Sequence, residues 1–218
     1  MRIARLPPSR RVWIFDLDNT LHDAAAHIFP SMHQQINAYL RRRFGVDEAG
    51  ANRMRRDFWL RYGTTLQGLM RHHGDDPRRF LAQTHVFPEL ADMVVRENAL
   101  RHALARLGGR KLVFSNAPRR YVEQVIRAIR VARFFDAVYT IEDTGYRGKP
   151  HRWSFHRLLR KLRLDPHRCA LIDDMLGNLR TAHELGMSTV WVSPVGRRVS
   201  YVDLRISSVT ELPRRIRP

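Results

Sequence analysis

The stretch "VWIFDLDNTLHD", from Val12 to Asp23, joins an apolar run to two closely spaced acidic residues. The apolar part predicts a buried strand, in which side chains two positions apart point to the same side. We therefore expect Asp16 and Asp18 to emerge together at the end of that strand. Ligands of open α/β sheets bind at this carboxyl edge. Paired carboxylates repel unless a cation lies between them or one is protonated, and Mg²⁺ suits such oxygen ligands.

The rest of the chain alternates short apolar runs with helical periodicity. Apolar residues recur at helical spacing after Arg119 and again after Pro150, which predicts two amphipathic helices. The other predicted strands are "KLVFSN", "AVYTI", "CALIDD" and "STVWVS". This alternation predicts an α/β fold, with a Rossmann-like, mostly parallel sheet covered by helices on both faces.

A long interval without a convincing strand separates the first strand from "KLVFSN". It carries helical stripes, one around Ile36 and Leu40 and another formed by Phe58, Leu60 and Leu66 with Leu69. We interpret it as an α-helical module inserted after the first strand. The expected domains are a core made of residues 1–22 and 94–218 and a helical cap made of residues 23–93.

Composition narrows the class of protein. The hydrophobic fraction of 44% is enough for a core, and no apolar run is long enough to span a bilayer. Cys169 is the single cysteine, which excludes an internal disulfide and a cysteine-based metal cluster. We therefore expect a cytoplasmic protein with no membrane partner.

The formal net charge of +18 raises the alternative of nucleic-acid binding. Arg is scattered over the whole length, Lys occurs only three times, and the longest basic run is Arg41 to Arg43. A dedicated binding face more often shows a basic helix or arm with interleaved aromatic residues. The pattern favours attraction of a small anionic substrate, with no specific nucleic acid as partner.

Polar groups also follow other predicted strands. "LVFSN" ends in Ser115 and Asn116, "CALIDD" ends in Asp173 and Asp174, and "GYRGKP" places Lys149 before a predicted helix. Each feature alone has a structural reading, since Ser-Asn and Asp-Asp cap helices and an isolated Lys is usually solvated. Together they supply metal ligands, polar donors and an ammonium, which suits attack by a carboxylate on a phosphoryl group.

The order "DLDNT … SN … KP … DD" resembles the haloacid dehalogenase (HAD) superfamily. Within it, the chain looks most like the pyrimidine 5′-nucleotidase-type branch. That narrower resemblance rests on "FDLDNTLHD", "RYGTTLQGL", "FSNAPRRY" and "IDDMLGNLRTAHELGM". The resemblance implies that the insert is a helical type 1 cap, which closes over the active site.

The resemblance also implies a role for each motif residue. Asp16 would be the nucleophile that forms an aspartyl-phosphate, and Asp18 would protonate the leaving alcohol and then activate water. Ser115 and Asn116 would bind the phosphoryl group, and Lys149 would neutralise charge on Asp16 and the phosphate. Ser115 and Lys149 thereby count among the catalytic residues as well as the phosphate ligands.

The implied cofactor is Mg²⁺. Asp16 and the backbone carbonyl of Asp18 would face the metal, and Asp174 would be a direct ligand, with Asp173 as a further ligand or a support beside it. Many relatives carry another Asp four residues after Asp174, where this chain has Asn178. A neutral amide can orient a water or another ligand, so metal binding is expected to persist with altered strength.

The implied reaction is phosphomonoester hydrolysis, because dehalogenases of this superfamily lack an acid at the position of Asp18. A pyrimidine nucleoside 5′-monophosphate such as UMP or CMP is the expected substrate. Alternatives are a phosphatase for a sugar phosphate or phosphoglycolate, a phosphomutase, and a basic nucleic-acid-associated module. In the cap, Trp59, Tyr62 or Thr65 would recognise the base, unless this segment is only cap core. The oligomeric state stays open.

Overall fold

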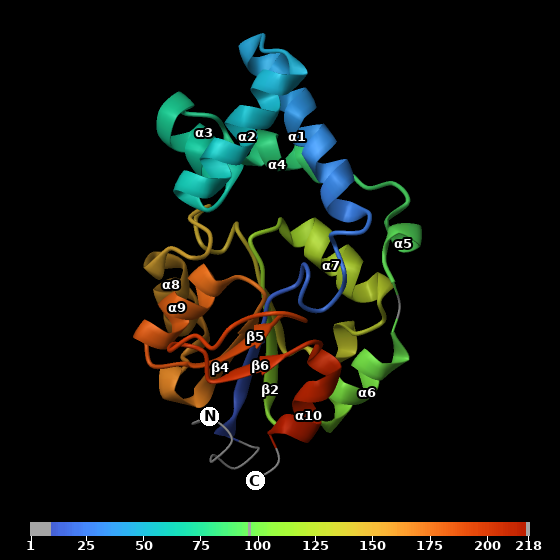
Figure 1. The fold of residues 1–218 in the computed structure, drawn as a ribbon, viewed down its shortest axis with the longest axis vertical. Helices are drawn as coiled ribbons and strands as arrows, with labels where there is room; N and C mark the ends of the chain where they lie inside the picture. The colour runs from blue at the N-terminus through green and yellow to red at the C-terminus, as the bar shows by residue number, and fades with distance from the viewer. Residues whose placement is uncertain (1–9, 96, 217–218) are drawn as a thin grey trace.

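The computed structural model describes residues 10–95 and 97–216. Residues 1–9, 96 and 217–218, which belong to the predicted core, lie outside the described part. The centre of the fold is a six-stranded sheet in the order β3-β2-β1-β4-β5-β6, with every neighbouring pair parallel (Figure 1). The strands are β1 (Val12–Phe15), β2 (Arg110–Phe114), β3 (Ala137–Tyr139), β4 (Cys169–Asp173), β5 (Ser188–Val192) and β6 (Leu204–Ile206). The α/β fold class is confirmed.

The five predicted strands are all present, and the sheet is wholly rather than mostly parallel over the described residues. The strand β6 was not predicted. It has three residues, of which Arg205 is exposed and only Ile206 is buried, so it has no apolar run to mark it.

Helices connect the strands and form a separate layer after β1. They are α1 (Ile28–Phe44), α2 (Glu48–Tyr62), α3 (Thr65–His73), α4 (Pro77–Thr84), α5 (Leu90–Met93), α6 (Asn98–Arg106), α7 (Arg119–Ala128), α8 (Arg152–Leu162), α9 (Leu176–Glu184) and α10 (Leu212–Arg215). No helix among the described residues is both long enough and apolar enough to cross a membrane.

The strand β1 lies at the centre of the sheet and is buried along its whole length. It pairs with β2 on one side and β4 on the other, so that Phe15 aligns with both Val113 and Ile172. The order of the strands reverses at this point. In open α/β sheets a crevice forms at such a reversal, beyond the carboxyl ends of the strands. Asp16 is the first residue beyond β1.

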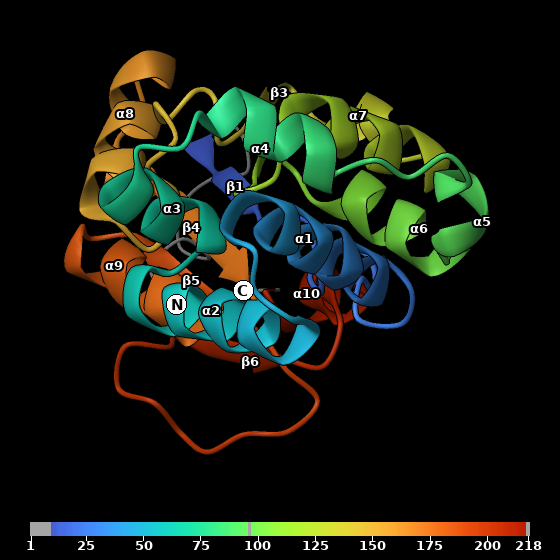
Figure 2. The same cartoon turned by 90° about the horizontal axis from the view of Figure 1, so that it is seen from above.

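Apolar side chains cover both faces of the sheet, as a central parallel strand requires. Trp13 and Phe15 belong to the cluster on the face covered by α6, α7 and α10, whereas Ile14 belongs to the cluster under α8 and α9 (Figures 1 and 2). On the second face Phe114 of β2 packs edge-on against Phe155 of α8, with 5.3 Å between ring centroids. Helices thus cover both faces of the sheet below the crevice.

The helices α1 to α4 lie beyond the carboxyl ends of the strands (Figure 1) and pack around an apolar cluster of their own. Leu40, Leu66 and Leu69 are buried there, which agrees with the predicted helical stripes. The prediction was wrong for Leu60, whose side chain is 68% exposed on α2. Leu90 of α5 already packs with the sheet-face cluster. The division into a core and a cap at residues 22/23 and 93/94 stays a prediction.

Candidate active site

Four segments bring the predicted site residues to the crevice beside β1. Asp16 continues from β1, and its N–H donates to the Ile172 carbonyl oxygen of β4 (2.9 Å). Ser115 continues from β2 in the same way, with its N–H donating to the Tyr139 carbonyl oxygen of β3 (3.0 Å). Asp173 ends β4, and Lys149 arrives on the loop between β3 and α8. Parallel strands thus place polar residues from distant parts of the chain at one edge.

A buried ammonium joins two of the carboxylates. Lys149 Nζ donates to Asp16 Oδ1 and to Asp173 Oδ2, each at 2.8 Å, and the Lys149 side chain is 1% exposed. Oxygens of Asp16, Asp173 and Asp174 lie within 4.8 Å of one another. One ammonium therefore faces three carboxylates, which leaves an excess of negative charge.

The pKa shifts reflect this excess. The pKa of Asp16 is raised, and burial of its carboxyl group is the largest cause. The charge of Lys149 lowers this pKa, and the charges of Asp173, Asp174 and Asp18 raise it. Burial, followed by the charge of Asp173, raises the pKa of Asp174 to about 6. Burial lowers the pKa of Lys149, but its two carboxylate partners outweigh burial, so this pKa is raised and the ammonium stays charged. A divalent cation among these oxygens would favour the ionised carboxylates.

Asp173 and Asp174 differ in their surroundings. Asp173 is fully buried, and both of its carboxylate oxygens accept from the Asn178 amide nitrogen, at 2.9 and 3.0 Å. The Met175 N–H also donates to Asp173 (2.8 Å). Asp174 is only partly buried, and its backbone carbonyl accepts from the Trp191 indole (3.0 Å). Asp174 thus has the freer carboxylate, and Asn178 orients Asp173, as a neutral amide can.

The Asn116 side-chain amide forms hydrogen bonds with the backbone of Lys149. Its Nδ2 donates to the Lys149 carbonyl oxygen (2.9 Å), and its Oδ1 accepts from the Lys149 N–H (2.7 Å). A Cβ at Gly148 would lie 2.6 Å from Asn116 Oδ1, so this approach requires glycine. Ser115 is buried, and its hydroxyl accepts from the Ala117 N–H (3.0 Å). Phosphate binding by Ser115 and Asn116 stays a prediction.

Asp18 has two partners that the sequence patterns did not identify. His22 Nε2 lies 3.0 Å from Asp18 Oδ1, and the Tyr121 hydroxyl donates to the same oxygen at 2.6 Å. The loop that carries Asp18 turns at Asn19, whose φ is 58° and whose side chain accepts from the N–H groups of Ala24 and Ala25. Both His22 and Tyr121 stood in quoted motifs, but neither spacing nor residue type indicated this contact.

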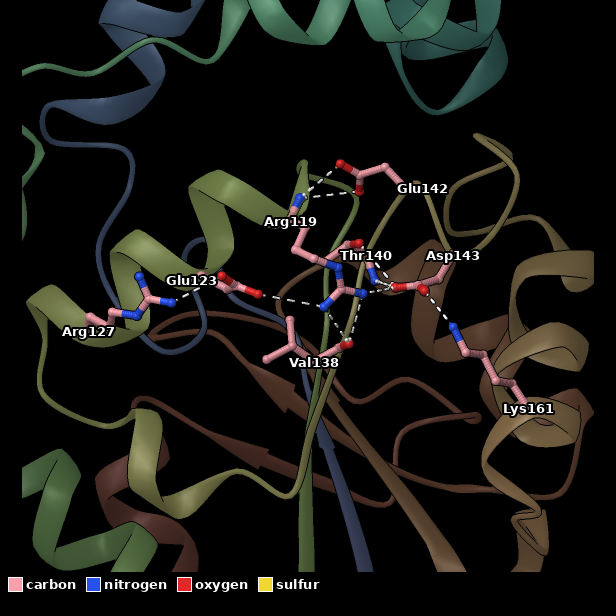
Figure 3. A network of polar contacts seen from close by, with 8 residues as sticks. All are labelled: Arg119, Glu123, Arg127, Val138, Thr140, Glu142, Asp143 and Lys161. Carbon is pink, nitrogen blue, oxygen red and sulfur yellow. Dashed lines mark hydrogen bonds and ion pairs between the residues drawn. The ribbon is translucent and has the colours of Figure 1, made fainter.

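An ionic network fixes the loop that leads to Lys149 (Figure 3). The Arg119 N–H, at the start of α7, donates to both Glu142 oxygens (3.0 and 3.2 Å), and its guanidinium contacts Asp143 at 2.5 Å. Lys161 of α8 donates to the other Asp143 oxygen (2.7 Å). Two helices therefore hold this loop from both sides, which limits where Lys149 can lie.

The cap residues singled out for base recognition lie in α2 and α3. Trp59 is 47% exposed, the Tyr62 hydroxyl lies 2.5 Å from His72 Nε2, and the Thr65 hydroxyl donates to the Arg55 carbonyl oxygen (3.3 Å). Between Tyr62 and Thr65, the junction of the two helices approaches the catalytic edge. A Cβ at Gly63 would lie 3.0 Å from Pro150 Cδ and 3.5 Å from the Lys149 carbonyl oxygen. Base recognition by these side chains stays a prediction.

Comparison with solved structures places the fold among known ones. The chain is similar to a HAD phosphatase from Thermococcus onnurineus, with a TM-score of 0.66 and 20% identity over 94% of this chain and 97% of that one. It is also similar to the L-2-haloacid dehalogenase from Xanthobacter autotrophicus, with a TM-score of 0.62 and 17% identity over 95% and 98% of the two chains. At these identities the similarity concerns the fold alone.

Sequence comparison identifies a relative and a family. The chain is 25% identical over 197 residues to Phosphate metabolism protein 8 of Saccharomyces cerevisiae, a match that covers 84% of this chain and 61% of the yeast protein. The chain therefore spans about three fifths of that relative's length. A family model for haloacid dehalogenase-like hydrolases matches residues 11–186, which include all four motifs of the crevice. This chain belongs to the haloacid dehalogenase-like hydrolase family.

Proposed function

We propose that this protein is a Mg²⁺-dependent phosphomonoester hydrolase that acts through an aspartyl-phosphate, with a pyrimidine nucleoside 5′-monophosphate as its substrate. The observation that carries the chemistry is the Lys149 ammonium bonded to Asp16 at the edge of a three-carboxylate cluster. Membership of a hydrolase family and the name of the yeast relative support hydrolysis of a phosphorylated compound.

In the first half of the reaction, a carboxylate oxygen of Asp16 attacks the phosphorus atom. The bond between phosphorus and the leaving oxygen breaks, and Asp18 gives its proton to that oxygen, which departs as an alcohol. In the second half, the Asp18 carboxylate takes a proton from water as the water oxygen attacks phosphorus. The bond between Asp16 and phosphorus breaks, which releases phosphate and restores both carboxyl groups.

Lys149 serves both halves because its ammonium stays charged and lies 2.8 Å from Asp16. It offsets the charge of the phosphate as that group approaches the acidic cluster. Its two carboxylate partners also hold it in place, so little reorganisation is needed when the substrate binds. The helical layer α1 to α4 would act as the cap above this site.

The donor set fits Mg²⁺, since every available ligand atom is oxygen. Asp16, Asp174 and the backbone carbonyl of Asp18 would hold the ion, with Asp173 oriented beside them by Asn178. Mg²⁺ supplies positive charge that offsets the phosphate oxyanions.

Substrate choice rests on the resemblance to the nucleotidase branch and on the cap. The turn at Gly63 lies next to Lys149 and Pro150 at the catalytic edge. Tyr62 precedes this turn and Thr65 follows it. Trp59 is exposed one helical turn earlier. An aromatic face that stacks on a base would suit a nucleotide, and the net charge of +18 favours an anion. Such a metabolite is intracellular, and we propose the cytoplasm as the compartment.

Replacement of the nucleophile tests the chemistry. We expect Asp16→Asn to lower kcat for p-nitrophenyl phosphate by at least about a thousandfold, because an amide cannot form the acyl-phosphate. Asp23→Asn is the matched control, since its side-chain oxygen can still accept from the Ala25 and Ala26 N–H groups, and it should retain activity. Substantial turnover by Asp16→Asn would contradict the mechanism.

Removal of metal tests the cofactor. We expect EDTA to abolish hydrolysis of p-nitrophenyl phosphate and added Mg²⁺ to restore it. Mg²⁺ should also raise the thermal midpoint of the metal-free protein, because an ion that binds only the folded state stabilises it. Asp174→Asn should need more Mg²⁺ for both effects. Full activity in EDTA would exclude the proposed cofactor.

The buried ammonium predicts a pH-dependent loss of stability. Lys149→Met leaves Asp16 and Asp173 without their cation, and we expect a loss of about 3–5 kcal/mol in the free energy of unfolding at pH 7 without metal. Since the raised pKa of Asp16 rises further in this variant, proton uptake by the folded state should shrink the loss between pH 7 and pH 5.

Lys161→Met is the matched control for this measurement by urea unfolding. Its side chain is 58% exposed, so loss of its ion pair with Asp143 should cost under about 1 kcal/mol and stay constant over the same pH range. A similar, pH-independent loss for both variants would contradict the role given to Lys149.

A panel of phosphorylated metabolites tests the substrate. We expect kcat/KM for UMP and CMP to exceed the values for AMP, sugar phosphates and phosphoglycolate by about tenfold or more. Trp59→Ala should lower that preference. Equal values would contradict the pyrimidine assignment and leave the chemistry intact. Transfer of phosphate to a sugar would indicate a phosphomutase. Release of halide from 2-haloacids would indicate a dehalogenase. Salt-dependent DNA binding without hydrolysis would indicate a nucleic-acid-binding module.

A further inference from the structure

Both side-chain partners of Asp18 contact one of its two oxygens. The Tyr121 hydroxyl (2.6 Å) and His22 Nε2 (3.0 Å) lie against Oδ1. Among the residues that the structure describes, no hydrogen bond reaches Oδ2, and the Asp18 side chain keeps 16% of its exposure. The carboxyl group is therefore held at one oxygen and open at the other.

The Tyr121 ring is fixed by its surroundings. It is 1% exposed and packs against Phe87 and His85, with ring centroids 5.3 and 6.0 Å away. Burial, and then the charge of Asp18, raises the pKa of Tyr121 well above its ordinary value, so the hydroxyl keeps its proton and donates. These contacts belong to α7 and to the segment after α4, so Asp18 is held by elements remote from its own loop.

His22 is suited to donate from the other side. Its side chain is fully buried, and its Nδ1 is buried without a hydrogen-bond partner in the described part of the chain. Nε2, the ring nitrogen that faces Asp18, can carry a proton and donate it to the Oδ1 hydrogen bond. One O–H donor and one N–H donor thus converge on the same carboxylate oxygen.

This arrangement decides which oxygen exchanges protons. Two donors at Oδ1 stabilise charge there and prevent rotation of the carboxyl group. Oδ2, which accepts no hydrogen bond from a described residue, is therefore the oxygen left to exchange a proton with a reacting group. A proton donor is effective when it is aimed at the leaving oxygen before the bond breaks.

We propose that Tyr121 and His22 are positioning residues, which hold Oδ1 of Asp18 so that Oδ2 delivers the proton to the leaving oxygen and later accepts one from water. The inference rests on the proposed phosphatase function and deepens it. It assigns a role to two residues that had been given none by the family resemblance.

The test compares leaving groups that differ in their need for a proton. Tyr121→Phe removes one donor and keeps the buried ring. We expect kcat/KM for the alkyl phosphomonoesters UMP and glycerol 2-phosphate to fall about tenfold. For p-nitrophenyl phosphate, whose leaving group departs without protonation, kcat/KM should stay within about twofold. Its kcat should still fall, because water activation in the second half also needs Asp18.

His22 supplies an independent variant pair in case Tyr121→Phe does not fold. His22→Leu should reproduce the same selective loss on alkyl substrates, and His22→Gln, which keeps an N–H donor near the Nε2 position, should restore most of it. Tyr39→Phe is the matched control. It removes a buried tyrosine hydroxyl that donates to Asp75 (2.8 Å) in the helical layer, and it should leave the alkyl-to-aryl ratio unchanged.

The outcomes separate this inference from the proposed function. If Asp16→Asn abolishes activity but Tyr121→Phe and His22→Leu leave the alkyl-to-aryl ratio of kcat/KM unchanged, the positioning role is overturned and the phosphatase function stands. If Asp16→Asn retains activity on every substrate, the proposed function itself fails. A selective loss on alkyl substrates, rescued by His22→Gln, supports the role.

Discussion

The site depends on one buried contact, the Lys149 ammonium between Asp16 and Asp173. Three carboxylates with oxygens within 4.8 Å of one another would repel strongly in a protein interior if nothing offset their charge. Lys149 offsets part of it and leaves the remainder for a divalent cation and for the field that a phosphate meets. The same residues that make the crevice reactive are therefore the ones that make it costly to fold.

Much of the surrounding structure serves to place that ammonium. The Asn116 side chain brackets the Lys149 backbone, and Gly148 allows it to approach. On the far side, the Thr181 hydroxyl of α9 donates to the Pro150 carbonyl oxygen (2.9 Å). Arg119 anchors the start of the same loop from α7. The loop is thus attached to neighbours on both faces of the sheet, and a cation on a long flexible side chain acquires a defined position.

The sequence predicted those parts of the structure that have a local signature. Apolar runs that end in polar residues marked β1, β2 and β4, and the parallel arrangement then required Asp16, Ser115 and Asp173 to meet at one edge. The short strand β6 escaped prediction because a single buried residue carries no pattern. Leu60 matched a helical stripe, but α2 presents a narrow apolar face and leaves it in solvent.

Contacts between remote residues could not be predicted in this way. The bond between Tyr121 and Asp18 joins positions 103 residues apart, and it depends on how α7 packs rather than on any motif. The role of Asn178 is similar, since the sequence indicated a neutral amide near the acidic pair but not that it would bond to Asp173. Residue type and spacing thus located the reacting groups, whereas their orientation required the three-dimensional packing.

Gly63 connects the end of a helix to the space above the catalytic edge. Its φ of 82° ends α2 in the left-handed conformation, and its missing side chain lets that turn lie against Pro150. An L-residue at this position would strain the turn and also push the helical layer away from Lys149. The distance between the helical layer and the Lys149–Pro150 segment is therefore coupled to the way α2 ends. A substitution chosen only to change the end of this helix would therefore also change how closely the helical layer can approach Lys149.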